Sequence, residues 1–216
     1  MHHLHISRCQ SIFWVYGHNV TNKFTIVFVN NVLGDISTSL ILKGEPESFL
    51  QQLKQWFSFT KLSYCWRASF DGWNSRIFHS KCDYRGKTIT LVKVGRYIFG
   101  GYSTNQWGGS SGSYRTSSSN YIFSLRNKDN LSPFRSDVYQ NSNNAIYTDP
   151  DYGPTFGGGH DIHIASNANK NTNSYTNFGH TYRPPSGYSY TSSNTRALLA
   201  GSYTFTPDEV EVYYYA

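Results

Sequence analysis

The sequence TITLVKVGRYIFGGY, residues 88–102, decides the fold. A run of mostly β-branched and apolar residues comes first, Gly95 and Arg96 follow, and an aromatic run begins at Tyr97. Two such segments joined by two turn residues are typical of a β-hairpin. We therefore expect a pair of antiparallel strands here and further β-structure around them.

Strands are also expected on both sides of this hairpin. Residues 62–68 alternate with a period of two, which predicts a strand with one buried face. Further short strands are predicted at residues 121–125, 145–147, 161–165, 197–205 and 210–215. The stretch 108–119 is almost entirely Gly and Ser, and the segment between residues 148 and 160 is rich in Pro and Gly. We expect a flexible loop in the first and a turn in the second.

The clearest helical pattern lies at residues 46–57, where apolar residues follow helical spacing and Pro46 suits the first turn. Short strands, long polar loops and one clear helix predict a mostly β domain with two packed antiparallel sheets. At the C-terminal end, Val210 and Val212 alternate with Glu209 and Glu211. This alternation predicts a strand with a buried valine face and a solvated glutamate face.

Composition limits the class of protein. The 216 residues suit one domain, and aromatic residues make up 17% of them against only 15% charged residues. A chain so rich in rings is expected to fill its core with aromatic side chains, which argues against a disordered chain. The scarcity of Glu, Lys, Ala and Leu argues against a helical bundle. Apolar runs are too short for a membrane span. Residues 1–33 are a poorly specified N-terminal segment, and residues 34–216 form the expected domain.

Three cysteines, Cys9, Cys65 and Cys82, show no metal-ligand spacing. The spacing allows one bridge between Cys65 and Cys82, but an odd number of cysteines without a disulfide framework favours free thiols in a reducing compartment. We therefore expect a cytoplasmic protein.

The positive charge is concentrated in one part of the chain. The formal net charge is +6, and residues 61–96 contain eight basic residues against Asp71 and Asp83. Such a stretch either steers acidic partners or is an ordinary solvated strand surface. Arg85 lies in a turn expected at residues 83–86 and Lys87 directly follows it, and we predict that both residues contact a partner.

A series of short blocks occurs along residues 37–216. The blocks are WRASFDGW (66–73), FHSKCD (78–83), GKTITL (86–91), FGGY (99–102) with Trp107, YIFSL (121–125), GPTFG (153–157) with Asp161 and Ile162, LAG (199–201) and EVEVY (209–213). In this order they resemble the TLDc domain. The resemblance implies a two-sheet β-sandwich with a few flanking helices. It also implies a family linked to oxidative-stress resistance and to binding of the vacuolar proton-pumping ATPase.

Two groups of residues suggest chemistry. In the stretch GGGHDIH at residues 157–163, the Gly-rich backbone could hold a phosphate, and His160, Asp161 and His163 could bind a metal or move protons. It lacks a P-loop pattern, and we expect a turn that leads into a strand whose polar face meets solvent or caps the loop. His79 and Cys82 could form a nucleophile pair, but we expect His79 to pack or to form hydrogen bonds. We therefore predict no catalytic, cofactor-binding or metal-binding residue, and the role of His160, Asp161 and His163 stays open.

These observations favour a non-enzymatic protein-interaction domain of TLDc type, without a cofactor. The expected partner is a peripheral subunit of the vacuolar ATPase, and neither nucleic acid nor a membrane span is expected. One alternative is a lectin-like module that binds polar ligands or glycans through Trp73, Trp107 and the many tyrosines. A second alternative is an uncharacterised hydrolase or redox enzyme.

Overall fold

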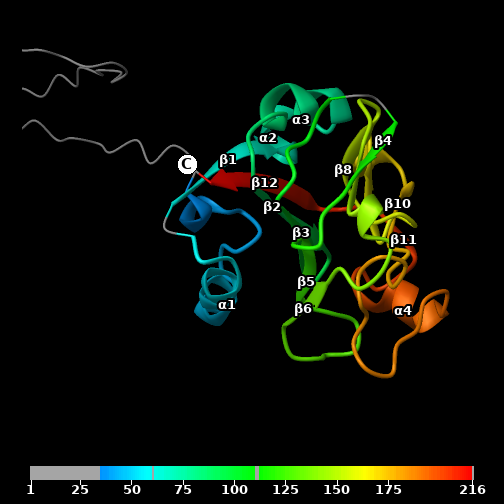
Figure 1. The fold of residues 1–216 in the computed structure, drawn as a ribbon. Coiled ribbons are helices and arrows are strands. Elements are labelled where there is room, and N and C mark those ends of the chain that lie inside the picture. Colours follow the sequence, from blue (N-terminus) through cyan, green and yellow to red (C-terminus); the bar gives the residue numbers. More distant parts are fainter. Residues whose placement is uncertain (1–34, 60, 110–111, 216) are drawn as a thin grey trace, which may run out of the picture. The chain divides into compact units, whose positions relative to one another are not determined.

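The structure is a computed structural model that describes residues 35–59, 61–109 and 112–215. In this part of the chain, two antiparallel sheets of six strands each pack face to face (Figure 1). The mostly β sandwich predicted from the sequence is therefore confirmed. The expected boundary between residues 1–33 and the domain lies outside the described residues.

The first sheet contains the predicted hairpin. Its strand order is β1 (Leu62–Arg67), β12 (Glu209–Tyr215), β2 (Thr88–Val94), β3 (Tyr97–Ser103), β5 (Tyr121–Arg126) and β6 (Phe134–Asp137). Strands β2 and β3 form the hairpin, with Val94 opposite Tyr97 and Gly95 in the turn at φ +54°. Strand β12 lies between β1 and β2, so the C-terminal strand is not at an edge of the sheet.

The second sheet contains two strands that were expected to be loops. Its order is β11 (Thr204–Phe205), β10 (Ser174–Tyr175), β9 (Ile162–Ala165), β8 (Tyr152–Phe156), β7 (Ile146–Thr148) and β4 (Ser113–Arg115). The Gly/Ser stretch 108–119 contains β4, and the expected Pro/Gly turn contains β8. The register between β8 and β9 shifts between Tyr152 and Thr155. Gly153 and Pro154 therefore occupy an irregular part of the strand, where proline is tolerated.

Helices cover the edges and one outer face of the sandwich. They are α1 (Glu47–Phe57), α2 (Ala68–Asp71), α3 (Ser75–Cys82) and α4 (Ser193–Leu198), with short 3-10 helices η1 (Ile36–Thr38), η2 (Ser142–Asn144) and η3 (Ala168–Lys170). Helix α1 follows Pro46 as predicted, and its buried Phe57 stacks on Tyr102 of β3 with ring centroids 5.1 Å apart. None of the helices in the described ranges has the length and apolar character that a membrane crossing requires.

The strand predicted at residues 197–205 is wrong. Helix α4 includes the start of this stretch, a turn follows, and pairing in β11 is limited to Thr204 and Phe205. Leu198 and Leu199 are fully buried. A short buried apolar run looks the same in a helix as in a strand, so periodicity could not separate the two.

Aromatic side chains fill the space between the sheets, as the composition suggests. Trp66, Phe99, Trp107 and Phe156 are at most 1% exposed and belong to one core cluster. Trp107 packs edge to face on Phe156 with ring centroids 5.5 Å apart. A second cluster lies between α1 and the outer face of the first sheet.

The glutamates of β12 are not solvated, which corrects the expectation for this strand. Glu211 is fully buried. Its carboxylate accepts hydrogen bonds from Ser39 Oγ, from Leu40 N at 2.9 Å, from Arg67 Nε at 2.7 Å and from Tyr213 OH. The alternation of valine and glutamate in β12 assigned the glutamate face to water. The segment around η1 covers Glu211 on this face.

The two cysteines that the structure describes, Cys65 and Cys82, form a disulfide. The free thiols expected from the sequence are therefore wrong for this pair, and Cys9 lies outside the described residues. The bond joins β1 to α3, and the Cα atoms of Cys65 and Cys82 are 5.3 Å apart. Sequence spacing allowed this bridge, but only the packing of α3 against β1 brings the two sulfurs together.

Candidate functional site

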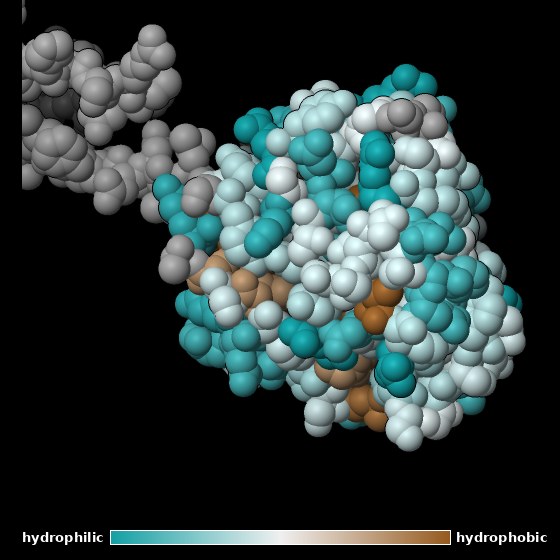
Figure 2. All heavy atoms as spheres, viewed as in Figure 1, coloured by the Kyte–Doolittle hydropathy of each residue, from teal (hydrophilic) through white to brown (hydrophobic). Residues whose placement is uncertain are grey.

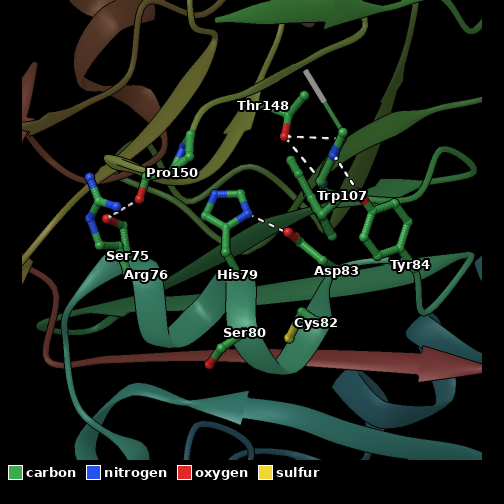
Figure 3. A network of polar contacts seen from close by, with 12 residues as sticks. Ser75, Arg76, His79, Ser80, Cys82, Asp83, Tyr84, Trp107, Thr148 and Pro150 are labelled. Atoms are coloured by element: carbon green, nitrogen blue, oxygen red, sulfur yellow. Dashed lines mark hydrogen bonds and ion pairs between the residues drawn. The ribbon is translucent and has the colours of Figure 1, made fainter. Parts of the chain in front are cut away.

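Helix α3 carries a network of polar contacts at one end of the sandwich (Figure 3). Asn74 caps its N-terminus, where the side chain accepts a hydrogen bond from Arg76 N at 2.9 Å. The buried face of the helix consists of Ser75, Phe78, His79 and Cys82, which follow helical spacing. This face packs against both β1 and β8, so α3 connects the two sheets.

His79 is held at both ring nitrogens. Its Nδ1 lies 2.7 Å from Asp83 Oδ1, and its Nε2 lies 3.0 Å from the backbone oxygen of Tyr152 in β8. Both partners are acceptors, so the protonated ring, which donates from both nitrogens, satisfies both contacts. Burial lowers the pKa of His79, but the hydrogen bond to Asp83 and the charge of that carboxylate outweigh burial and raise the pKa above its usual value.

The contacts around His79 fasten α3 to neighbouring loops. Ser75 Oγ donates to the backbone oxygen of Pro150 at 2.8 Å. The backbone of Asp83 forms an isolated β-bridge with the backbone of Trp107. A Cβ atom at Gly108 would lie 2.7 Å from Asp83 Oδ2, so this close approach requires glycine. The arrangement is a structural junction in which His79 is a hydrogen-bonding residue.

His79 and Cys82 do not form the nucleophile pair that was considered from the sequence. The sulfur of Cys82 is bonded to Cys65, and Figure 3 shows it pointing away from the imidazole of His79. A nucleophilic cysteine needs a thiolate beside its base. In this structure the geometry therefore supplies no such pair.

The charge on His79 predicts how stability depends on pH. A histidine whose folded pKa is raised stabilises the fold below its unfolded pKa of about 6.5, and this contribution is lost as pH rises through the folded pKa. We expect Tm to fall by about 2–4 °C between pH 7 and pH 9 through loss of about 1 kcal/mol. Thermal unfolding at a series of pH values measures this change.

His79→Gln provides the control for that experiment. His160 and His163 have lowered pKa values, so their contributions are lost below pH 6.5, outside this window. Asp161, whose pKa burial raises to about 7, also lowers stability as it finishes ionising just above that pH, so the variant should be less stable at pH 7 and should show a smaller decline above it than wild type. An equal decline in His79→Gln and wild type would contradict the assignment.

Asp161 caps a loop. The sequence had predicted that the polar face of this strand either meets solvent or caps the loop, and the second prediction holds for Asp161. The residue is fully buried, and its Oδ1 accepts hydrogen bonds from the backbone nitrogens of Gly179 at 2.8 Å and His180 at 3.0 Å. Thr181 and Tyr182 donate to the same carboxylate. Burial raises the pKa of Asp161 to about 7, while these backbone donors oppose the shift.

The two neighbouring histidines lie among tyrosines. His160 Nδ1 is 2.7 Å from Tyr175 OH, and His163 Nδ1 is 3.0 Å from Thr155 Oγ1. Burial lowers the pKa of His163 to about 3, so this ring is neutral. In the described ranges no three side chains of the metal-binding types gather. The structure therefore does not combine Asp161 with the two histidines into one site.

Arg85 and Lys87 are exposed and lie at one end of the first sheet. The Arg85 guanidinium stands 5.2 Å above the Tyr214 ring, and the backbone oxygen of Lys87 accepts from Tyr215 N. Lys61 precedes β1, whose first residue pairs with Tyr215. These three cations, which we name the basic end (Lys61, Arg85 and Lys87), surround the end of β12 that is marked C in Figure 1.

Ion pairs compensate part of the positive charge of residues 61–96. The pairs are Arg67–Glu211, Arg76–Asp151, Lys81–Asp71 and Lys93–Glu45. In the part of the chain that the structure describes, the residues of the basic end form no ion pair. Lys61 was missed as a candidate because only the strand order brings the start of β1 beside the end of β12.

A model of the TLDc domain family matches residues 37–216. The chain belongs to the TLDc-domain family. Comparison with curated proteins gave no match to the chain. The resemblance carried by the ordered sequence blocks is therefore confirmed.

The first block of this TLDc domain, WRASFDGW, has a structural explanation. It connects β1 through α2 to the start of α3. Trp66 Nε1 donates to the backbone oxygen of Gly72 at 2.9 Å, and Asp71 Oδ2 accepts from Arg67 N at 2.8 Å. Gly72 has φ +113°, and a Cβ atom there would lie 2.8 Å from Ile77 Cδ1. The block therefore forms a tight connection.

The rings considered for ligand stacking in this TLDc domain are largely engaged with one another. Trp107 is fully buried and donates to Thr88 Oγ1. Tyr147 is inclined by 58° to Tyr114 and by 67° to Tyr152. These tyrosines therefore pack on one another with their rings tilted. The glycan-binding alternative stays an untested prediction.

The face of the TLDc domain shown in Figure 2 is mostly hydrophilic, with hydrophobic colour confined to small spots. A broad apolar docking surface is therefore not visible on this face. Charged and polar side chains would make most of the contacts with a partner there.

Proposed function

We propose that this TLDc domain is a non-enzymatic protein-interaction domain that binds peripheral subunits of the vacuolar proton-pumping ATPase. The proposal includes a cytoplasmic location, a contribution to oxidative-stress resistance and no requirement for a cofactor. Membership of the TLDc family carries this proposal, because the family is linked to that partner and that role.

The basic end supports a docking role. Its three cations are concentrated where three strand ends meet, and within the described chain no acid pairs with them. Such a group attracts an acidic surface over a distance of roughly 10 Å at moderate salt. Charges at the rim of an interface act mainly on the association rate, whereas packed contacts set the lifetime of the complex.

The test is binding of the purified domain to vacuolar-ATPase peripheral subunits at two ionic strengths. In Arg85→Glu/Lys87→Glu we expect association to slow by about tenfold at low salt, with a smaller change in dissociation. Wild-type binding should weaken with salt but persist. Both substitutions are at exposed positions, so the variant should keep its Tm.

Lys43→Glu/Lys54→Glu is the matched control, because it makes the same change in net charge at two exposed residues near α1. This control should associate at nearly the wild-type rate. Absence of binding by the folded wild-type domain would reject the partner. An equal slowing in the two double variants would reject the basic end while leaving the partner in place.

A further inference from the structure

A hollow opens beside the disulfide at the edge of the first sheet. It has a volume of about 370 Å³ and is lined by residues of β1, α3 and β12, among them Cys65, Lys81 and Tyr214, and by Arg85 from the segment that follows α3. Strand β1 is an edge strand of its sheet, so no further strand covers this side. The volume is near the lower end of the 300–1,000 Å³ that is typical of small-molecule sites.

The hollow gives access to the disulfide from one side only. Cys65 lines it and is 8% exposed, whereas Cys82 is fully buried and does not line it. Exchange of a disulfide requires a thiolate to approach one sulfur along the S–S bond. Cys65 is therefore the sulfur that an incoming thiolate would meet.

The walls of the hollow are positively charged. Arg85 Nε donates to the backbone oxygen of Lys81, which keeps the guanidinium at the hollow and above the Tyr214 ring. Lys81 is 43% exposed and pairs with Asp71, while Arg85 has no acidic partner among the described residues. This environment attracts a thiolate, and it attracts more strongly a thiol that also carries carboxylates.

We propose that the Cys65–Cys82 disulfide is an exchange site for small anionic thiols of the glutathione class. The first thiolate attacks Cys65 Sγ, and a mixed disulfide forms on Cys65. The S–S bond breaks, and its electron pair leaves on Cys82 Sγ, which then takes a proton. A second small thiolate attacks the small-thiol sulfur of the mixed disulfide, and Cys65 leaves as a thiolate.

The complete exchange reduces the protein disulfide to two thiols and oxidises two small thiols to one disulfide. Helix α3 then loses its covalent link to β1 and keeps its contacts through Ser75 and His79 to the second sheet. The site is thus a reversible modification site. The chemistry requires no partner, since every step involves only this domain and the thiol, although Arg85 belongs both to the hollow and to the basic end.

The first experiment compares two thiols that differ in charge, N-acetylcysteine and N-acetylcysteine amide, at equal thiolate concentration on the native domain. Alkylation followed by mass spectrometry measures free Cys65 and Cys82 over time. We expect the carboxylate-bearing thiol to react about fivefold faster at low salt, and Arg85→Gln to abolish this difference. Arg96→Gln removes an equally exposed charge at the β2–β3 turn and should preserve it.

The second experiment identifies the attacked sulfur. Cys82→Ser and Cys65→Ser, each confirmed as folded by thermal unfolding, are incubated with oxidised glutathione. We expect a glutathione adduct on Cys65 in the first variant and no adduct on the buried Cys82 in the second. Equal rates for the two thiols, a native disulfide inert to both, or preferential modification of Cys82 would each overturn the proposal. If a cysteine variant does not fold, the comparison of the two thiols on the native domain tests the proposal alone.

Discussion

Removal of residues 207–216 should give a chain that does not fold and is recovered in the insoluble fraction. These residues contain β12, which pairs with β1 on one side and with β2 on the other. Without β12 the first sheet is divided, and two strand edges are exposed together with the part of the core that Val210 and Val212 cover. Expression followed by fractionation and circular dichroism measures the effect.

Removal of residues 1–33 is the comparison for this truncation, because these residues precede the part that the family model matches. We expect that shorter chain to be soluble and to unfold cooperatively. A soluble product with an unchanged Tm after loss of residues 207–216 would contradict the central position of β12.

Glu211→Ala should lower the free energy of unfolding by about 3–5 kcal/mol, because it leaves a buried cation without its partner. The Arg67 side chain is 13% exposed and loses its carboxylate. Ser39 Oγ and Leu40 N lose an acceptor in the same change. In a domain of this size we expect Tm to fall by about 10 °C.

Glu47→Ala serves as the control. Glu47 is exposed in the first turn of α1 and accepts a hydrogen bond from Gln51, so its loss should cost about 0.5 kcal/mol. Glu211→Gln keeps the volume but removes the charge, and its Tm should lie between wild type and Glu211→Ala. If the two alanine variants lose the same stability, the buried network does not hold the η1 segment.

The local sequence pattern was sufficient to predict elements whose apolar residues follow a regular period. The hairpin of β2 and β3 and the helix after Pro46 agree with their predictions. Strand β8 was missed because Gly153 and Pro154 look like a turn until the shifted pairing with β9 is known. The short strand β4 likewise depends on β7, a partner that is distant in the sequence.

Contacts between distant residues explain the remaining differences at the candidate sites. The alternation of residues in β12 could not show that the segment around η1 covers Glu211. Counting the charges in residues 61–96 could not show which acidic residues pair with Arg67 or Lys93. In the same way, the spacing of Cys65 and Cys82 allowed a disulfide without requiring one. Arg85 and Lys87 were proposed from the sequence and remain an untested prediction, whereas Lys61 joined them only once the strand order was known.

The central position of β12 has a consequence for synthesis on the ribosome. Arg67 of β1 precedes its partner Glu211 by 144 residues, so at normal elongation rates β1 waits roughly 7–30 s for β12 to be translated. During this time β1 and β2 expose the backbone groups that β12 will later pair with, which is the type of surface on which nascent chains associate. Strand β12 can therefore pair with β1 and β2 only after Glu209–Tyr215 have been translated, and until then both strand edges stay open to other chains.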